Sequence, residues 1–308
     1  MIETTGFLHP GATAAVVAPS GPVDAALLRR GIERLEERGV KVVVGPHALD
    51  RQDLPYLAGE DAARAADLQA AWCDPAVSVV FCARGGYGAS RLLGLLDWDA
   101  MRAAGRKVLV GSSDVTALHQ AFAVELGVPT LHGPMPGNLL LGGEHGPGAG
   151  PEPVTWDHLW AALSGSPVTV TGDRVLVPGR AEGVLTGGNL SLLAALCGTP
   201  YRPSFDGGIA FLEDIGEEPY RIDRMLTQLL HAGAFAGVRG IALGSWVDCG
   251  DPYPVLRDRL EPLGVPIVAG LPVGHGSPQL SVWLGALGAI DTESCSLTGP
   301  YWNEEQAR

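Results

Sequence analysis

The sequence predicts an α/β protein with two domains. Short strands that are apolar throughout alternate with helical segments, a pattern typical of a parallel sheet covered on both faces. The length of 308 residues suggests about two domains, and 43 glycines with 18% charged residues fit many tight turns between buried elements. We expect a Rossmann or flavodoxin-like parallel-sheet domain over residues 1–164 and a smaller C-terminal α/β domain over residues 165–308.

The N-terminal domain begins with an apolar run over residues 12–18, which predicts a buried strand. Asp24 is placed to cap the next helix, which continues to Arg38 with aliphatic residues at helical spacing. Further along we expect a strand over 40–44, a helix over 61–72, a strand over 77–82, a helix over 89–96, a strand over 108–110 with a helix after it, a short strand ending at His132 and a helix over 156–163.

The C-terminal domain begins with short strands and turns from Val168 and then alternates again. The expected elements are a helix that starts at Gly187-Gly188-Asn189 and runs to Leu196, a strand over 209–212, a helix over 221–232 and strands over 241–246 and 266–269. Ligands of open α/β sheets bind at the carboxyl ends of the strands, so the turns that follow the strands are where we expect function.

Charge and cysteine content exclude several classes of protein. The formal net charge is −13 and no basic run occurs, which argues against nucleic-acid or anionic-membrane partners. The five cysteines form no CxxC pair, so neither a disulfide framework nor a zinc site is expected. The N-terminus lacks the pattern of a signal peptide, and no apolar run reaches about 18 residues. We therefore expect a cytoplasmic protein.

The most informative segment is Gly111-Ser112-Ser113-Asp114, the serine turn, which joins a strand to a helix. A serine on such a turn can present its Oγ beside unpaired backbone amides, as serine hydrolases require. Serine is also a preferred N-cap, and Ser113 could simply cap the following helix. The turn by itself leaves both interpretations open.

A serine nucleophile needs a base and an acid that orients the base. His275 lies between two glycines after a strand, and Glu213 closes a buried strand, where an ionised carboxylate must be paired. Glu213 could instead form an ion pair with Arg221 or Arg224. His119 lies too far along the helix after the serine turn to be the partner, and His132 could line a cleft or be structural.

The Gly-rich turn, residues 84–88 (Arg-Gly-Gly-Tyr-Gly), follows the strand over 77–82. It matches neither GxGxxG nor the P-loop, so it is a weak signal for phosphate binding. Its amides could instead hold an oxyanion that forms at the neighbouring strand end.

These segments together resemble the LD-carboxypeptidase family of serine peptidases, over nearly the whole chain. The segments that carry the resemblance, in order, are Val-Ala-Pro-Ser at 17–20, Tyr-Leu-Ala-Gly at 56–59, Ala-Arg-Gly-Gly-Tyr-Gly at 83–88, Gly-Ser-Ser-Asp-Val-Thr at 111–116, His-Gly-Pro-Met at 132–135, Gly-Gly-Asn-Leu at 187–190, Leu-Glu-Asp-Ile-Gly-Glu at 212–217 and Gly-His-Gly at 274–276. No single segment is decisive, but their order and spacing are specific.

The resemblance implies a catalytic triad of Ser113, Glu213 and His275, with the nucleophile in the first domain and its two partners in the second. It also implies that backbone amides of Gly86 and Asp114 bind the oxyanion. The implied reaction removes terminal D-Ala from murein tetrapeptides in the cytoplasm during cell-wall recycling, after an L-centre that is diaminopimelate or Lys. No metal or cofactor is expected, and the family suggests a homodimer.

Three alternatives remain at this point. The neighbouring Ser112 could attack, although the third position of the turn favours Ser113 because Ser112 would point back toward the strand. The substrate could be an aminoacyl-nucleotide analogue, as for a microcin-C-type immunity peptidase, which would need an aromatic platform among Trp160, Trp246 and Trp283. The protein could also bind a nucleotide or sugar phosphate without catalysis, at the Gly-rich turn and the helix after the serine turn.

Overall fold

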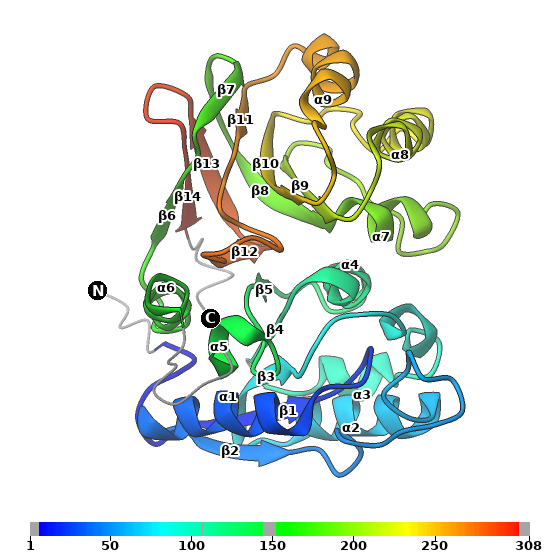
Figure 1. The fold of residues 1–308 in the computed structure, drawn as a ribbon, viewed down its shortest axis with the longest axis vertical. Helices are drawn as coiled ribbons and strands as arrows, with labels where there is room; N and C mark the ends of the chain where they lie inside the picture. The colour runs from blue at the N-terminus through cyan, green and yellow to red at the C-terminus, as the bar shows by residue number, and fades with distance from the viewer. Residues whose placement is uncertain (1–5, 106, 144–151, 302–308) are drawn as a thin grey trace. The chain divides into compact units, whose positions relative to one another are not determined.

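The computed structural model describes residues 6–105, 107–143 and 152–301, which form two compact units that divide between Ser166 and Pro167 (Figure 1). Both units combine helices with a sheet, so the prediction of a two-part α/β fold is confirmed. Within the described ranges, no helix is both long and apolar enough to cross a membrane.

The first unit is built on a sheet of five parallel strands. They are β1 (Thr13–Val17), β2 (Lys41–Val44), β3 (Val77–Cys82), β4 (Val108–Gly111) and β5 (Thr130–His132). The strands lie in the order β2-β1-β3-β4-β5, and every neighbouring pair is parallel. This is the flavodoxin-like order, in which the direction of winding reverses between β1 and β3 and ligands bind at the carboxyl ends of the strands. The Gly-rich turn and the serine turn both follow strands at that edge.

Side-chain caps mark the start of some helices of the first unit. Asp24 accepts hydrogen bonds from Ala26 N at 2.9 Å and Leu27 N at 2.8 Å and so caps α1 (Ala25–Glu37), as predicted. The other helices are α2 (Asp61–Cys73), α3 (Trp98–Arg102), α4 (Thr116–Glu125), α5 (Leu139–Gly142) and α6 (Pro153–Leu163). The helix predicted over 89–96 is wrong in extent: only the 3₁₀ turn η1 (Ala89–Leu92) forms, and Asp97 then caps α3.

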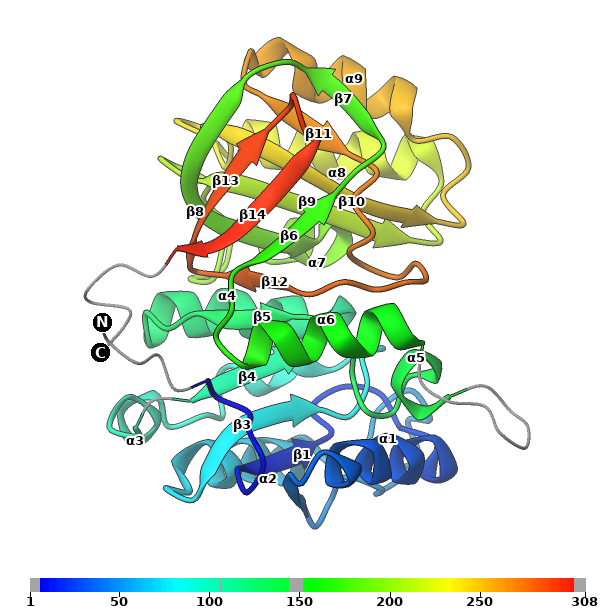
Figure 2. The same ribbon diagram turned by 90° about the vertical axis from the view of Figure 1, so that its left-hand side faces the viewer.

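The second unit contains a mixed sheet of eight strands. They are β6 (Val168–Thr171), β7 (Arg174–Val177), β8 (Arg180–Asn189), β9 (Ile209–Ile215), β10 (Gly240–Val247), β11 (Ile267–Ala269), β13 (Leu287–Asp291) and β14 (Ser296–Tyr301). Strands β8, β9, β10 and β11 are parallel neighbours, while β6, β14 and β13 pair antiparallel on one side and β7 on the other (Figure 2). The short strand β12 (Val282–Leu284) lies against β8.

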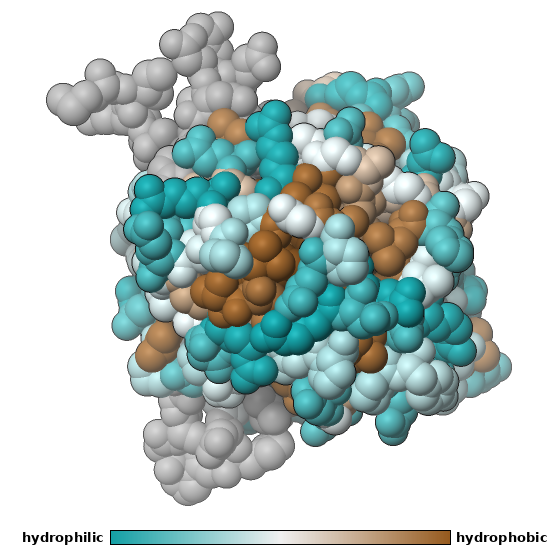
Figure 3. Space-filling view, turned by 90° about the horizontal axis from the view of Figure 1, so that it is seen from above, coloured by the Kyte–Doolittle hydropathy of each residue, from teal (hydrophilic) through white to brown (hydrophobic). Residues whose placement is uncertain are grey.

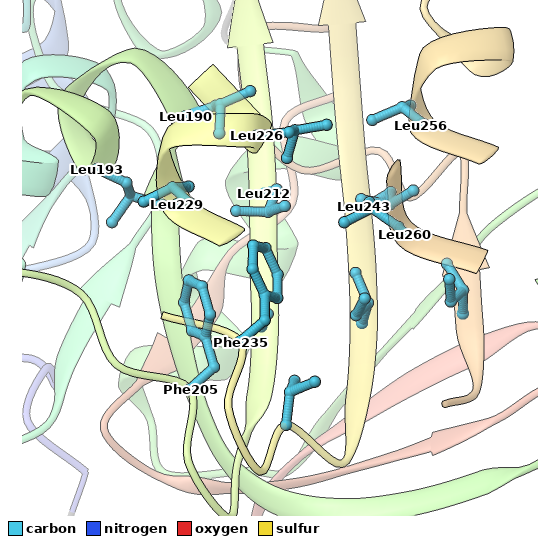
Figure 4. Close-up of a cluster of buried hydrophobic side chains, with 14 of the residues drawn as sticks. Leu190, Leu193, Phe205, Leu212, Leu226, Leu229, Phe235, Leu243, Leu256 and Leu260 are labelled. Carbon is cyan, nitrogen blue, oxygen red and sulfur yellow. The ribbon is translucent and has the colours of Figure 1, made fainter. Parts of the chain in front are cut away.

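Side chains point alternately to the two faces of the parallel strands, and each face contributes to a separate hydrophobic core. On β9, Leu212 belongs to the core under α7 (Leu190–Ala195), α8 (Pro219–His231) and α9 (Tyr253–Leu260), which Figure 4 shows in close-up. Its neighbour Phe211 points the other way, into the core beneath β6, β13 and β14. Because side chains alternate with a period of two, Glu213 shares a face with Phe211, and Asp214 shares a face with Leu212.

The outer surface of the second unit is mixed in character. Figure 3 looks onto the face that carries α9 and β7, where a band of hydrophobic residues is bordered by hydrophilic ones. The 3₁₀ turn η3 (Glu261–Leu263) follows α9 on this unit.

Candidate active site

The serine turn places Ser113 in a conformation that serine seldom adopts. Its φ is +62°, in the left-handed region that costs a residue with a side chain roughly 1–2 kcal/mol. Ser113 is half-buried, whereas Ser112 is buried, with 3% of its surface exposed. A strained serine on a strand-to-helix turn is the arrangement that exposes a nucleophilic Oγ.

Capping does not account for this serine. Ser113 begins the 3₁₀ turn η2 (Ser113–Val115), and the helix α4 that follows starts at Thr116 with Val115 in the N-cap position. Val115 has no side-chain group that could cap α4 by hydrogen bonding. The N-cap interpretation of Ser113 is therefore wrong, because the extra 3₁₀ turn separates the serine from the helix it would cap.

Asp114 joins the serine turn to the Gly-rich turn. One oxygen of its fully buried carboxylate accepts a hydrogen bond of 2.8 Å from Ala89 N, directly after the Gly-rich turn. Burial raises the pKa of Asp114, while Ser20 and the amides of Ala89 and Gly88 act in the opposite direction. The Asp114 side chain thus holds the Gly-rich turn in place, and this role is separate from the expected oxyanion binding by its backbone amide.

Arg64 also binds the Gly-rich turn, at Gly88, and nothing in the sequence had indicated this role. Its side chain is fully buried and donates to backbone carbonyls of three separate turns, at Pro19, Gly59 and Gly88. Its charge is balanced by an ion pair with Asp61 on the same helix. These bonds tie together segments that the sequence presents as separate motifs.

Glu213 and His275 form a direct pair in the second unit. A carboxylate oxygen of Glu213, which is fully buried at the carboxyl end of β9, lies 2.7 Å from His275 Nδ1. The sequence also left open an ion pair of Glu213 with Arg221 or Arg224; Arg221 pairs with Glu217 at 3.3 Å. The pairing at Nδ1 leaves Nε2 as the ring nitrogen that can accept a proton from a nucleophile.

The carboxylate of Glu213 raises the pKa of His275. Burial by itself lowers the pKa of His275, but the hydrogen bond and charge of Glu213, with Asp214 behind it, outweigh burial and raise the pKa above its ordinary value. A raised pKa makes His275 a stronger base for taking the proton of a nucleophile.

The loop over residues 270–278, the histidine loop, is held by a serine that the sequence did not single out. Ser245 Oγ, at the end of β10, accepts hydrogen bonds from His275 N at 2.8 Å and Gly276 N at 3.3 Å. Gly274 has φ +125°, and a Cβ there would lie 2.5 Å from both Glu213 Oε2 and Ser245 Oγ. Glycine at 274 is therefore what allows the loop to approach Glu213 so closely.

Asp214 organises the opposite face of β9. Its carboxylate accepts from Asn189 Nδ2 at 2.8 Å, and from Ser191 N at 2.9 Å at the start of α7. Burial raises the pKa of Asp214. Asp214 and Glu213 are adjacent on β9 but have different partners: Asp214 binds Asn189 and Ser191, whereas Glu213 binds His275.

Two further histidines are buried beside the serine strand. His119 Nδ1 lies 2.8 Å from Thr130 Oγ1, and its Nε2 lies 3.0 Å from Gly111 O. The carbonyl can only accept, so Nε2 carries the proton and Nδ1 accepts from the threonine hydroxyl. Burial lowers the pKa of His119 to about 3. His132 is fully buried, with its ring 6.1 Å from that of His119, which fits the structural interpretation.

The three tryptophans considered as platforms have different surroundings. Trp160 packs near Trp156 and under Arg38 in the first unit, and Trp283 is buried in the second. Trp246 lines a cavity of about 580 Å³ next to the histidine loop. In the described ranges, no group of three or more His, Cys, Asp and Glu residues could hold a metal ion.

Comparison with known proteins covers both units. Residues 14–133 match the model of the LD-carboxypeptidase N-terminal domain, and residues 182–290 match that of the LD-carboxypeptidase C-terminal domain. The chain is 53% identical, over 94% of each sequence, to a protein of Streptomyces coelicolor whose name as a carboxypeptidase is provisional.

Two further relatives have more specific names. The murein tetrapeptide carboxypeptidase of Pseudomonas aeruginosa is 35% identical over 87% of this chain and 89% of that protein. The solved structure of the microcin immunity protein MccF with glutamyl sulfamoyl guanosine superimposes with a TM-score of 0.84 at 25% identity, and covers 96% of this chain and 98% of that one.

Proposed function

Because the chain belongs to the LD-carboxypeptidase family and is a serine-type carboxypeptidase, we propose that it removes terminal D-Ala from murein tetrapeptides during cell-wall recycling. The bond cleaved would follow an L-centre, diaminopimelate or Lys. The observation that carries the proposal is the 2.7 Å pair of Glu213 with His275, since an imidazole oriented by a buried carboxylate is the base that a serine peptidase needs.

In the proposed mechanism Ser113 is the nucleophile, His275 the base and Glu213 the acid that orients it. His275 Nε2 takes the proton from Ser113 Oγ as that oxygen attacks the carbonyl of the L-residue. The imidazolium then gives its proton to the leaving D-Ala nitrogen, and the C–N bond breaks to leave an acyl-enzyme. Water, deprotonated by the same imidazole, hydrolyses the ester and restores Ser113.

Backbone amides of Gly86 and Asp114 are the proposed oxyanion donors. Support comes from the Gly-rich turn, which Asp114 and Arg64 fix beside the serine turn. An amide held in advance at the position where charge develops is worth roughly 10²–10³ in rate. We further propose a homodimer and a cytoplasmic site of action, which sedimentation and cell fractionation would test.

Substitution of the two serines tests the proposal. Ser113→Ala should reduce release of D-Ala from a murein tetrapeptide by roughly 10³-fold or more, since the nucleophile is lost. Ser112→Ala, one position away, is the matched control and should keep most of the activity. Activity of Ser113→Ala within tenfold of the parent would overturn the assignment.

A second candidate substrate is an aminoacyl-nucleotide analogue of the kind bound by MccF. The observation that favours it is the presence of Trp246 and Tyr253 in one cavity next to the histidine loop, since aromatic rings can stack on a base. Assays of both substrates with the same preparation separate the two candidates. Labelling of Ser113 by a fluorophosphonate probe would exclude a purely non-catalytic binding protein.

A further inference from the structure

Two arginines of the first unit meet at the segment that follows β1. Arg51 Nη2 donates to Val23 O at 2.6 Å, and Arg84 Nη1 donates to Pro22 O at 2.8 Å. Because these carbonyls belong to adjacent residues, the two guanidinium groups lie on the same short stretch of backbone. Both arginines are exposed. This arginine pair (Arg51 and Arg84) is therefore open to solvent beyond the carboxyl end of β1, the edge where parallel sheets bind ligands.

The arginine pair has only backbone partners within the described ranges. Arg84 bonds to Pro22 O there, and the other hydrogen bonds of Arg51 go to the carbonyls of Leu49 and Asp50, so neither guanidinium forms an ion pair with a carboxylate. Two like charges on adjacent carbonyls repel each other, and a bound anion would remove that repulsion. Since a guanidinium has five N–H donors, both side chains keep donors for such an anion.

The arginine pair also adjoins the proposed oxyanion site. Arg84 begins the Gly-rich turn, in which the amide of Gly86 is a proposed oxyanion donor. Gly85 O accepts a hydrogen bond of 3.0 Å from Gly21 N, and a Cβ at Gly86 would lie 3.2 Å from Gly21 Cα. Gly21 directly precedes the two residues whose carbonyls the arginines bind. The arginine pair and the proposed oxyanion donor thus belong to two backbone segments that are in contact.

We infer that the arginine pair binds the terminal carboxylate of the substrate and so restricts cleavage to the last peptide bond. This inference rests on the proposed function, in which Ser113 attacks the carbonyl before the terminal D-Ala. Because that carboxylate belongs to the residue directly after the scissile bond, its binding site must adjoin the oxyanion donors. Planar guanidinium groups bind carboxylates through paired, charged hydrogen bonds.

Two substrates that differ only in the terminal group test the inference. One is the tetrapeptide with a free terminal carboxylate, and the other is the same tetrapeptide with a C-terminal amide. Arg51→Met and Arg84→Met should each raise KM for the acid roughly tenfold to a hundredfold, since each removes charged hydrogen bonds. For the amide, KM should stay within about threefold of the parent, and kcat should change little with either substrate. The preference of the parent for the acid should therefore shrink in both variants.

Arg102→Met is the matched control. Arg102 is an exposed arginine of the same unit that also donates to a backbone carbonyl, Glu125 O at 2.8 Å, but it pairs with Asp99. Its loss should leave the ratio of kcat/KM between acid and amide as in the parent. Arg84→Lys keeps the charge without the planar fork and should show a smaller loss of preference than Arg84→Met. Thermal unfolding of all variants shows whether they fold.

Two outcomes would overturn the inference. An unchanged acid-to-amide ratio in either methionine variant would mean that the pair does not hold the carboxylate. Equal loss with both substrates would mean that the arginines only support the backbone at Pro22 and Val23. Failure of the proposed function looks different, because a parent enzyme that releases D-Ala from neither tetrapeptide, or a Ser113→Ala variant that keeps its activity, would refute that function itself.

Discussion

Ser113 stands directly against Gly85: a Cβ atom at position 85 would lie 2.8 Å from Ser113 Cβ and 3.1 Å from its Oγ. The Gly-rich turn therefore reaches the side chain of the proposed nucleophile with its backbone, which only a residue without a side chain permits.

Gly85→Ala should lower kcat/KM by at least roughly tenfold, because the added methyl group displaces Ser113 or the turn, and a small misplacement of reacting groups is costly. The effect should be mainly on kcat. Gly94→Ala is the control, since a Cβ there meets nothing within 4 Å. Hydrolysis assays with thermal unfolding of both variants check this. Full activity of Gly85→Ala would show that the contact does not constrain the serine.

Removal of the charge of Glu213 should change both the rate and its pH dependence. In the parent, the acid limb of kcat/KM should have its midpoint above 6.5, the ordinary pKa of histidine, because Glu213 stabilises the protonated imidazole. In Glu213→Gln that support is lost while burial remains, so the midpoint should move to lower pH. The maximal rate should fall roughly a hundredfold or more.

Glu217→Gln, four residues along, should keep the parental profile, because the half-buried Glu217 pairs with Arg221 and accepts from Ser191 Oγ rather than contacting His275. Full pH–rate profiles of the parent, Glu213→Gln and Glu217→Gln test this prediction. If the midpoint of the acid limb is unchanged in Glu213→Gln, that limb reflects the titration of a group other than His275.

His119 should make the protein sensitive to acid. Its folded pKa is about 3, against 6.5 for an ordinary histidine, so between these values the unfolded chain binds a proton that the folded chain does not. The free energy of unfolding should therefore fall with decreasing pH below 6.5, by up to about 1.4 kcal/mol per pH unit from this residue. Between pH 7.5 and pH 5, His119→Gln should lose less stability than the parent.

Urea unfolding at the two pH values measures the difference. His9→Gln, at the surface, should behave as the parent does. Equal losses in the parent and His119→Gln would refute the assignment of acid sensitivity to this residue.

Arg64→Met should destabilise the fold by about 3–5 kcal/mol, the usual cost of breaking a buried ion pair, because Asp61 and the carbonyls of three turns lose their donor. Arg29→Met is a suitable control: the Arg29 side chain is 72% exposed and pairs with Glu33 at 3.7 Å, so its loss should cost under about 1 kcal/mol. Chemical denaturation measures both. A change of less than about 1 kcal/mol in Arg64→Met would show that the turns do not depend on it.

Local signals made much of the fold predictable. The cap at Asp24 and the apolar run of β3 were predicted because each depends on neighbouring residues. The strand over 209–212 was predicted for the same reason, although it continues to Ile215. The strands β12, β13 and β14 were missed, because β13 is stabilised by pairing with β8, about a hundred residues earlier, and such pairing leaves little trace in the strand itself.

The site was predictable to the same extent. Glu213 was indicated by its place at a strand end and His275 by its flanking glycines, but their pairing is a contact across 62 residues that only the fold reveals. Arg64 looked like any polar residue of a helix, and nothing local showed that its side chain is fully buried. Ser245 follows a glycine at the end of a predicted strand, which was a usable signal.

The bonds of Arg64 also bear on how this protein can be redesigned. One cation serves carbonyls in the turns at Pro19, Gly59 and Gly88, so no one of these turns can take a new backbone path without disturbing the donor of the others. A loop graft from a relative should therefore exchange residues 19–21, 56–64 and 84–89 as one block. Single-loop chimaeras are expected to be less stable than the three-loop exchange.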